Sequence, residues 1–175
     1  MLAEAGLKNV PGGIVNPQAA GAQAPPDMND IQSPETYVAY AKAENFRDQA
    51  CEDEPHLYSP QASYDRNQWG LAASWTIGDE KAVLDRAPGK IIFRFHARDL
   101  HLVLGPGEKP VRFRVTVDGA APGAAHGADT DMDGNGVVTE QRLYQLVRQQ
   151  GPVADHTFTI EFLDPGVHAF SFTFG

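Results

Sequence analysis

The acidic residues from Asp129 to Glu140 have the spacing of a calcium-binding loop. The segment reads DTDMDGNGVVTE, with aspartate at loop positions 1, 3 and 5, glycine at position 6 and glutamate at position 12. Four carboxylates and a backbone carbonyl could supply most of the roughly six to eight oxygens that calcium takes. Two features oppose a site: Gly136 stands where an apolar residue normally pairs two such loops, and the preceding GAAPGAAHG cannot form a helix. We therefore expect these aspartates to shape turns, with calcium binding millimolar at best and no committed metal site.

A second group of charged residues could bind an anion or a sugar. These residues alternate with apolar ones in the second half of the chain, and they are Arg94, His96, Arg98, Arg112 and Arg114. Successive side chains of a strand point to opposite faces, so the basic residues should share an outward face. Guanidinium groups bond carboxylates, phosphates or vicinal hydroxyls in fixed geometry. Cross-strand pairing with acidic neighbours is the alternative interpretation.

Aromatic side chains could supply the platform on which a sugar ring stacks. Trp75 shares the spacing of Leu71 and Ile77, which predicts that it is buried. We expect the surface contacts from Trp69, Tyr58 and Tyr64, although plain packing is an alternative for each. The predicted ligand-binding residues are thus Trp69, Tyr58, Tyr64, Arg94, His96 and Arg98.

The sequence offers little for catalysis. Cys51 is the only cysteine, and the acidic residues that follow it disfavour a thiolate. No nucleophile elbow, phosphate-binding glycine loop or histidine spacing for a metal occurs. The net charge of −9 disfavours nucleic acid, and no apolar run reaches the roughly 20 residues that cross a bilayer. We expect a protein that is not an enzyme, needs no cofactor, and neither binds nucleic acid nor inserts into a membrane through this segment.

The elements that must position these residues are strands. Alternation of apolar and polar residues with period two recurs throughout the second half, separated by Gly- and Pro-containing turns. The predicted strands cover residues 37–41, 68–77, 81–85, 91–98, 100–104, 111–118, 137–147, 158–163 and 167–174. A polar loop is expected over 48–67. This pattern predicts an all-β fold, an antiparallel β sandwich of about nine strands, of the jelly-roll, carbohydrate-binding-module-like kind.

The first residues differ from the rest in composition. Residues 1–32 resemble the tail of a preceding domain followed by a linker of Pro, Gly and Ala. The sandwich domain is then expected to cover 33–175.

Four separated motifs carry a resemblance to a known family: SPETY at 33–37, FRFHARDLHLVLGP at 93–106, RLYQLVRQ at 142–149 and EFLDPGVHAFSFTFG at 161–175. In this order they resemble the carboxy-terminal domain of DipZ-type proteins, which act in thiol:disulfide interchange and cytochrome c biogenesis. In that family the domain follows an extracytoplasmic thioredoxin-like domain. The redox motif Cys-x-x-Cys is not in this sequence, so the resemblance implies an accessory role.

Residues and resemblance together lead to one functional expectation and one alternative. We expect a non-catalytic accessory binding domain, carbohydrate-binding-like, of an extracytoplasmic thioredoxin-like redox protein. Its partners would be the thioredoxin-like domain and a glycan. The alternative is a structural or protein-interaction domain that positions the redox domain and binds no small molecule.

Overall fold

The computed structural model describes residues 30–175. The expected tail and linker lie mostly outside these residues and stay a prediction. The elements in chain order are β2 (Thr36–Tyr37), β3 (His56–Tyr58), β4 (Trp69–Ile77), β5 (Ala82–Leu84), β6 (Gly89–His96), β7 (Asp99–Gly105), β8 (Val111–Val117), the 3-10 helix η1 (Gly123–Ala125), β9 (Asn135–Val138), β10 (Arg142–Arg148), β11 (Asp155–Phe162) and β12 (His168–Phe174). None of the helical structure in this range is long and apolar enough to cross a membrane.

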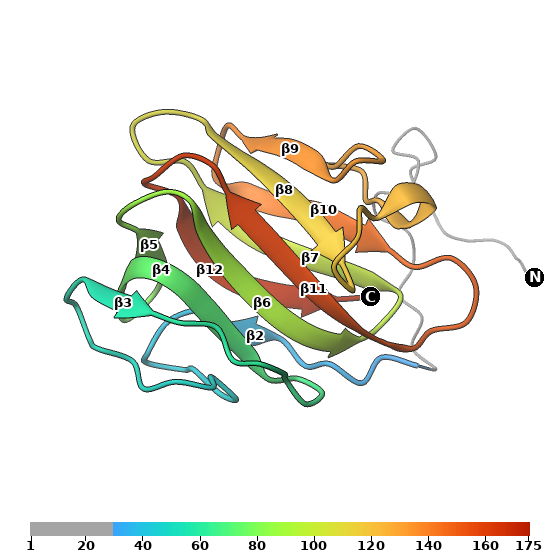
Figure 1. The fold of residues 1–175 in the computed structure, drawn as a ribbon, viewed down its shortest axis with the longest axis horizontal. Coiled ribbons are helices and arrows are strands. Elements are labelled where there is room, and N and C mark those ends of the chain that lie inside the picture. The colour runs from blue at the N-terminus through green and yellow to red at the C-terminus, as the bar shows by residue number, and fades with distance from the viewer. Residues whose placement is uncertain (1–29) are drawn as a thin grey trace, which may run out of the picture.

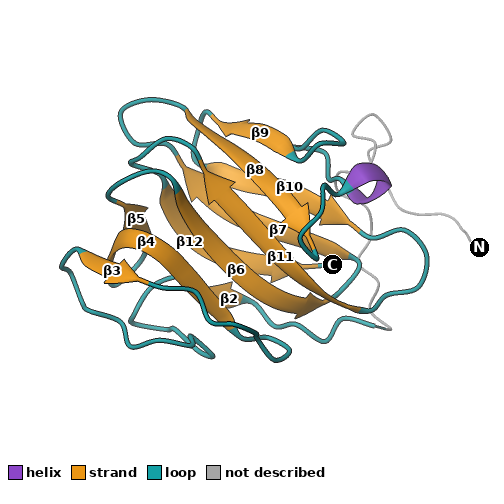
Figure 2. Cartoon of the chain, in the orientation of Figure 1, coloured by secondary structure: helices purple, strands orange, loops and turns teal. Residues whose placement is uncertain are grey.

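The strands form two layers that share β4. The front sheet, which faces the reader in Figure 1, runs from the first half of β4 through β6, β11 and β8 to β9. The rear sheet runs from β10 through β7, β12 and β5 to the second half of β4, with β2 beside β12 and β3 beside β4. Every pairing between these strands is antiparallel. The predicted all-β sandwich is confirmed, and Figure 2 shows its loops gathered at the two ends.

Aromatic rings fill the space between the layers. Phe93 of the front sheet lies 4.8 Å from Phe172 of the rear sheet, measured between ring centroids. Phe158 approaches the same ring at 5.9 Å, and Trp75 meets Phe162 at 6.0 Å. All five side chains are fully buried, Trp75 as predicted. Burial of each large apolar side chain stabilises the fold by roughly 1.5–3 kcal/mol, so this core holds the two sheets face to face.

β4 changes sheets at Ala73. Its first four residues, 69–72, pair with β6 of the front sheet. Its last residues, 73–77, pair with β3 and β5 of the rear sheet. Ala73 has a φ of 87°, outside the extended region, which bends the strand between the two layers.

Three predicted boundaries differ from the structure. The strand expected over 37–41 is only Thr36–Tyr37, and β3 lies inside the segment expected to be a loop. The strand expected over 137–147 is two strands, β9 and β10. The break is held by the Tyr144 hydroxyl, which accepts the backbone N–H groups of Thr139 and Glu140 and donates to the Glu140 carbonyl.

The bend of β4 can be tested by replacing Ala73 with glycine. A side chain at positive φ strains the backbone by about 1–2 kcal/mol, partly offset by the entropy that glycine loses on folding. We expect Ala73→Gly to raise the free energy of unfolding by up to about 1 kcal/mol. The measurement is urea denaturation. Ala72→Gly, at ordinary φ in the same strand, should lower stability by about 0.5–1 kcal/mol, and equal effects of the two substitutions would contradict the strain.

Candidate ligand-binding site

The predicted basic face exists on the outer side of the front sheet, and its cations are largely paired. Arg94 donates from Nη1 to the Thr157 hydroxyl at 3.0 Å and lies 4.0 Å from the Asp118 carboxylate. Arg114 points outward as predicted and donates to the Asn135 side chain at 3.2 Å. These contacts fit the cross-strand alternative. The face is polar, but Arg94 and Arg114 already have partners within the protein.

His96 and Arg98 do not lie on this face as free side chains. His96 is buried, and its two ring nitrogens contact Asp155 at 2.6 Å and Asp30 at 2.8 Å. Arg98 follows the end of β6, in a bend, and bonds the buried carboxylate of Asp99 at 2.9 Å. The alternation of residues 91–98 ends with β6, so Arg98 is not on the outer face with Arg94.

The expectation that Trp69 and Tyr58 offer surface contacts is wrong. Trp69 is fully buried, stacks on Phe46 with ring centroids 4.4 Å apart, and donates from its indole N–H to the Glu44 carbonyl at 2.8 Å. Tyr58, the last residue of β3, is 2% exposed because its side chain packs in the core cluster, and its hydroxyl accepts the backbone N–H of Cys51 at 3.0 Å. Each ring satisfies its polar atom internally, which is how buried Trp and Tyr are accommodated.

Tyr64 is the one predicted aromatic residue on the same side as Arg94. Its ring covers Gly70, where an added Cβ would lie 2.3 Å from the Tyr64 hydroxyl oxygen. Gly70 pairs with Ile92, two residues before Arg94 on β6. Burial raises the pKa of the half-buried Tyr64 phenol, although the Gln61 N–H that it accepts works the other way. The structure thus brings Tyr64 and Arg94 onto one face.

The first aspartate of the calcium-like loop protects a strand edge. Asp129 binds the Arg142 guanidinium at 2.8 Å and accepts the backbone N–H of Gln145 at 2.7 Å. The Asp129 N–H in turn donates to the Gln145 carbonyl at 3.0 Å. Gln145 belongs to β10, the outermost strand of the rear sheet. Asp129 therefore satisfies edge groups that would otherwise be open to another strand.

Asp131 satisfies backbone N–H groups at the edge of the front sheet. Its carboxylate accepts the backbone N–H groups of Asp133 at 3.0 Å and Asn135 at 2.8 Å. Asn135 begins β9, the outermost strand of the front sheet. Hydrogen bonds from Asn135, first from its backbone N–H, lower the pKa of the Asp131 carboxyl. These bonds are those of a turn, as expected. No group of three or more His, Cys, Asp or Glu side chains within residues 30–175 is placed to hold a metal ion.

A groove that the sequence did not indicate lies at one end of the rear sheet. Its volume is about 890 Å³, and its walls come from β5, the loop between β7 and β8, and the turn between β11 and β12. The lining includes Val83, Asp85, Glu108, Lys109, Asp164 and His168. Gly107 touches Gly166 closely, since an added Cβ would lie 2.8 Å from the Gly166 oxygen. This contact brings the loop and the turn together at the groove.

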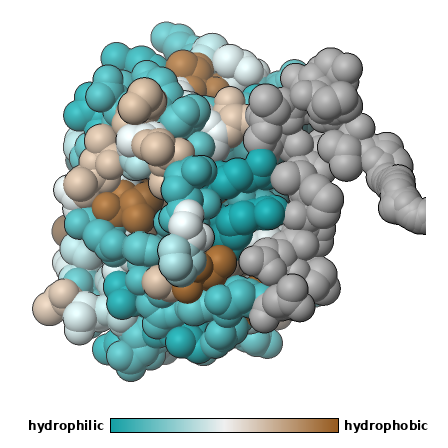
Figure 3. Space-filling view, turned by 90° about the vertical axis from the view of Figure 1, so that its right-hand side faces the viewer, coloured by the Kyte–Doolittle hydropathy of each residue, from teal (hydrophilic) through white to brown (hydrophobic). Residues whose placement is uncertain are grey.

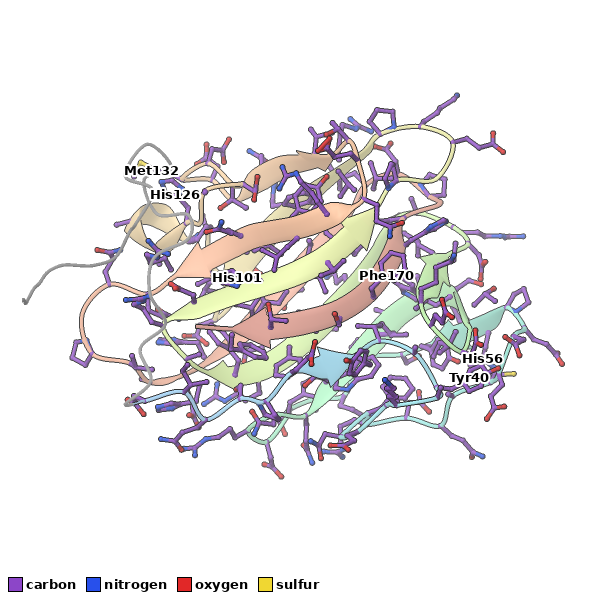
Figure 4. The ribbon with its side chains drawn as sticks, turned by 180° about the vertical axis from the view of Figure 1, so that it is seen from behind. Tyr40, His56, His101, His126, Met132 and Phe170 are labelled. Carbon is purple, nitrogen blue, oxygen red and sulfur yellow. The ribbon has the colours of Figure 1, made fainter. Side chains whose placement is uncertain are left out.

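Two polar side chains that line the groove, Asp85 and His168, lie in different surroundings. Asp85 accepts the hydroxyls of Thr76 at 2.9 Å and Ser74 at 3.2 Å, with no cation among its described partners. His168 has no described hydrogen-bond partner and meets Phe170 edge-on, with ring centroids 6.4 Å apart. Figure 4 labels Phe170 on β12 of the rear sheet. Burial, and then the nearby Lys81, lower the pKa of His168, which favours its neutral imidazole. A neutral imidazole can both donate and accept.

The groove was missed because its residues come from three distant segments. The motif at 161–175 includes the turn and His168, but no spacing in the sequence relates them to Asp85 or Lys109. The two pairings of β12 bring these groups together, because they place both Val83 of β5 and Gly105 of β7 opposite His168.

Fold and site define an all-β sandwich domain with a polar groove and without the cysteine pair of a redox centre. The chain belongs to the family described as the thioredoxin-like C-terminal domain, whose family model matches residues 33–175. Comparison with curated proteins gives no match. The association with thioredoxin-like proteins that the motifs indicated is therefore confirmed at the level of the family.

Removal of Asp129 should open the edge of β10. We expect Asp129→Ala to lower the free energy of unfolding by roughly 2 kcal/mol, because its donors, the Gln145 N–H and the Arg142 guanidinium, lose their charged acceptor. Thermal unfolding and light scattering measure stability and edge-to-edge association. The control is Asp133→Ala in the same loop, an exposed residue whose loss should cost no more than about 0.5 kcal/mol. Equal effects of the two substitutions would contradict the protective role.

The Asp164 carboxylate, ion-paired with Arg112 at the groove wall, should be protonated only in strong acid. Arg112 donates to Asp164 from its side chain at 2.8 and 2.9 Å and from its backbone N–H at 2.9 Å, which lowers the pKa of Asp164 to about 2. The contribution of this pair to stability is thus present above the usual pKa of 3.8 and is lost as the pH falls toward 2. In Arg112→Ala the pKa should move back toward 3.8. Carboxyl ¹³C NMR follows it, and an unchanged titration would refute the pairing.

Proposed function

We propose that this chain is a non-catalytic accessory domain of an extracytoplasmic, DipZ-type thioredoxin-like redox protein, and that it binds carbohydrate in the groove beside His168. The role as an accessory domain rests on the family and on the lack of a Cys-x-x-Cys motif. In this role the domain would hold the redox domain near a glycan.

The groove itself is the observation that supports ligand binding. Its volume of about 890 Å³ falls in the range of small-molecule sites, which is roughly 300–1,000 Å³. Its polar groups include acceptors at Asp85 and Glu108, a donor at Lys109, and both kinds at His168.

Such a mixture suits a ligand made of hydroxyl groups. Each sugar hydroxyl donates one hydrogen bond and accepts others, so it can bridge a carboxylate and a neutral imidazole. Phe170 is half-buried and meets His168 edge-on, but it does not line the groove, and the Lys81 ammonium lies over its ring at 5.8 Å from the centroid. Asp164 is already ion-paired with Arg112, so it forms part of the groove wall and is not offered as an acceptor for the sugar.

The outer face of the front sheet is the second candidate for the same function. Tyr64 lies on this face with Arg94, over Gly70 of the neighbouring strand. Beyond them on the same face lies a smaller hollow of about 370 Å³, lined by Arg114, Thr116, Ala121, Asp133 and Asn135. A flat aromatic platform with a polar row suits an extended glycan.

A titration separates the two surfaces. Isothermal calorimetry with oligosaccharides from bacterial cell walls should show binding that His168→Ala and Lys109→Ala weaken at least tenfold, which is about 1.4 kcal/mol. Arg94→Ala, on the front sheet, is the matched control and should bind like the parent. The reverse pattern assigns the glycan to the Tyr64 face. No heat of binding with millimolar ligand would end the carbohydrate proposal and leave a domain that positions the redox domain.

A further inference from the structure

His96 lies between two carboxylates at the end of the sandwich where β6 finishes. Its Nδ1 is 2.6 Å from Asp155, and its Nε2 is 2.8 Å from Asp30. The imidazole is 10% exposed. Asp155 begins β11, whereas Asp30 belongs to the leading segment, residues 30–33, through which the described chain reaches the sandwich. The described surface at this end is mostly hydrophilic (Figure 3).

The two contacts determine how many protons the imidazole carries. Ionised carboxylates only accept hydrogen bonds, so each ring nitrogen that contacts one must donate. A neutral imidazole has a single N–H, and its second nitrogen would present a lone pair to a carboxylate less than 3 Å away. Only the imidazolium, in which both nitrogens donate, can make both contacts hydrogen bonds at the same time.

The carboxylates are held in their ionised form by the same network. A hydrogen bond from Gln32, and then one from His96, lower the pKa of Asp30. Burial works against ionisation of Asp155, yet hydrogen bonds from His96 and Arg66 lower its pKa as well. The charged groups on the elements around the imidazole are Asp30, Arg66, Arg94, Arg98, Asp155 and His156.

Gln32 gives the network a second arrangement. Arg66 bonds the side-chain oxygen of Gln32, which directs the Gln32 amide nitrogen toward His96 and Asp30. That nitrogen now donates to Asp30 at 3.0 Å and lies 3.4 Å from His96 Nε2. When Nε2 has no proton, the same amide can donate to its lone pair. Asp30 then loses its charged donor, His96, and keeps at most the second N–H of the neutral Gln32 amide.

The two carboxylates are not equally well held. Asp155 is paired with β6 through its backbone and with Arg66 through its side chain at 3.1 Å. The side chain of Asp30 has only Gln32 and His96 as described hydrogen-bond partners. It is also the more exposed, at 37% against 28%. Loss of a ring proton should therefore free Asp30 and leave Asp155 in place.

The rest of the leading segment is held without charge. The Gln32 N–H donates to the His96 carbonyl at 2.9 Å, and its own carbonyl accepts the Asn67 amide at 2.9 Å. Ser33 accepts the His96 N–H at 2.8 Å and donates to Asn67 at 2.6 Å. These neutral bonds fix the segment from Gln32 onward. Ile31 is partly buried and packs against the core, so among residues 30–33 only Asp30 relies on the charged contact.

We propose that His96 is a charge-operated clamp on the leading segment. It holds Asp30 against the sandwich while the imidazole carries both ring protons, and it releases Asp30 when one proton is lost. The order of Asp30, the first residue that the structure describes, is thereby linked to pH. This inference is independent of carbohydrate binding.

NMR spectroscopy of the full 175-residue chain tests the clamp over a pH series. Long-range ¹H–¹⁵N spectra report whether each nitrogen of His96 carries a proton, and ¹⁵N relaxation reports the order of the Asp30 amide. We expect an order parameter of about 0.85 while both nitrogens are protonated, falling below roughly 0.6 as one proton is lost. Asp30 order that does not change with the protonation of His96 would overturn the proposal.

Three variants separate the clamp from general stability. In His96→Leu the Asp30 amide should be flexible at every pH. In Asp30→Asn, which alters only an exposed partner, the side chain can donate or accept, so the order of residue 30 should not depend on pH. His156→Leu removes a histidine that contacts a single carboxylate, Asp118 at 2.6 Å, and should leave Asp30 unchanged. A rigid Asp30 in His96→Leu, or a strong pH dependence in Asp30→Asn, would refute the clamp even if one variant failed to fold.

Discussion

The crossing of β4 from one layer to the other is the constraint on which both candidate surfaces depend. A strand can serve two sheets only where its backbone leaves the extended region, and here that place is Ala73. The half before it supplies Gly70, which Tyr64 covers on the front face. The half after it supplies Ser74 and Thr76, whose hydroxyls hold Asp85 in the groove. One strained residue therefore positions groups on opposite sides of the sandwich.

The calcium-like loop shows how one sequence pattern can serve a different physical need. Carboxylates at alternate positions are suitable ligands for a hard cation, but they are also strong acceptors for backbone N–H groups. In this fold the aspartates accept backbone N–H groups, because the loop runs along the outermost strands of both sheets. Asp129 serves β10 and Asp131 serves β9. The context that decides between the two roles is the neighbouring strand, which the loop sequence does not contain.

The sequence predicted the architecture well and the site poorly. Period-two alternation is a local property, so it located the long strands, but β2 and β3 span two and three residues and are too short to show a period. Trp69 was misjudged although it has the same parity as Leu71 and Trp75, and extending the alternation back by two residues would have buried it. The groove and the clamp at His96 join distant segments, which only the strand pairing brings together.

The close contact of Gly107 with Gly166 has a consequence for how this domain can diversify. Any side chain at Gly107 would collide with backbone, so the spacing between the two groove walls is fixed by the main chain. The neighbouring Glu108 and Lys109 are exposed and bear none of the core packing, so their replacement costs little stability. Related domains can thus acquire new ligand preferences by exchanging two surface side chains on a rigid frame, in the way that antibody loops vary on a constant scaffold.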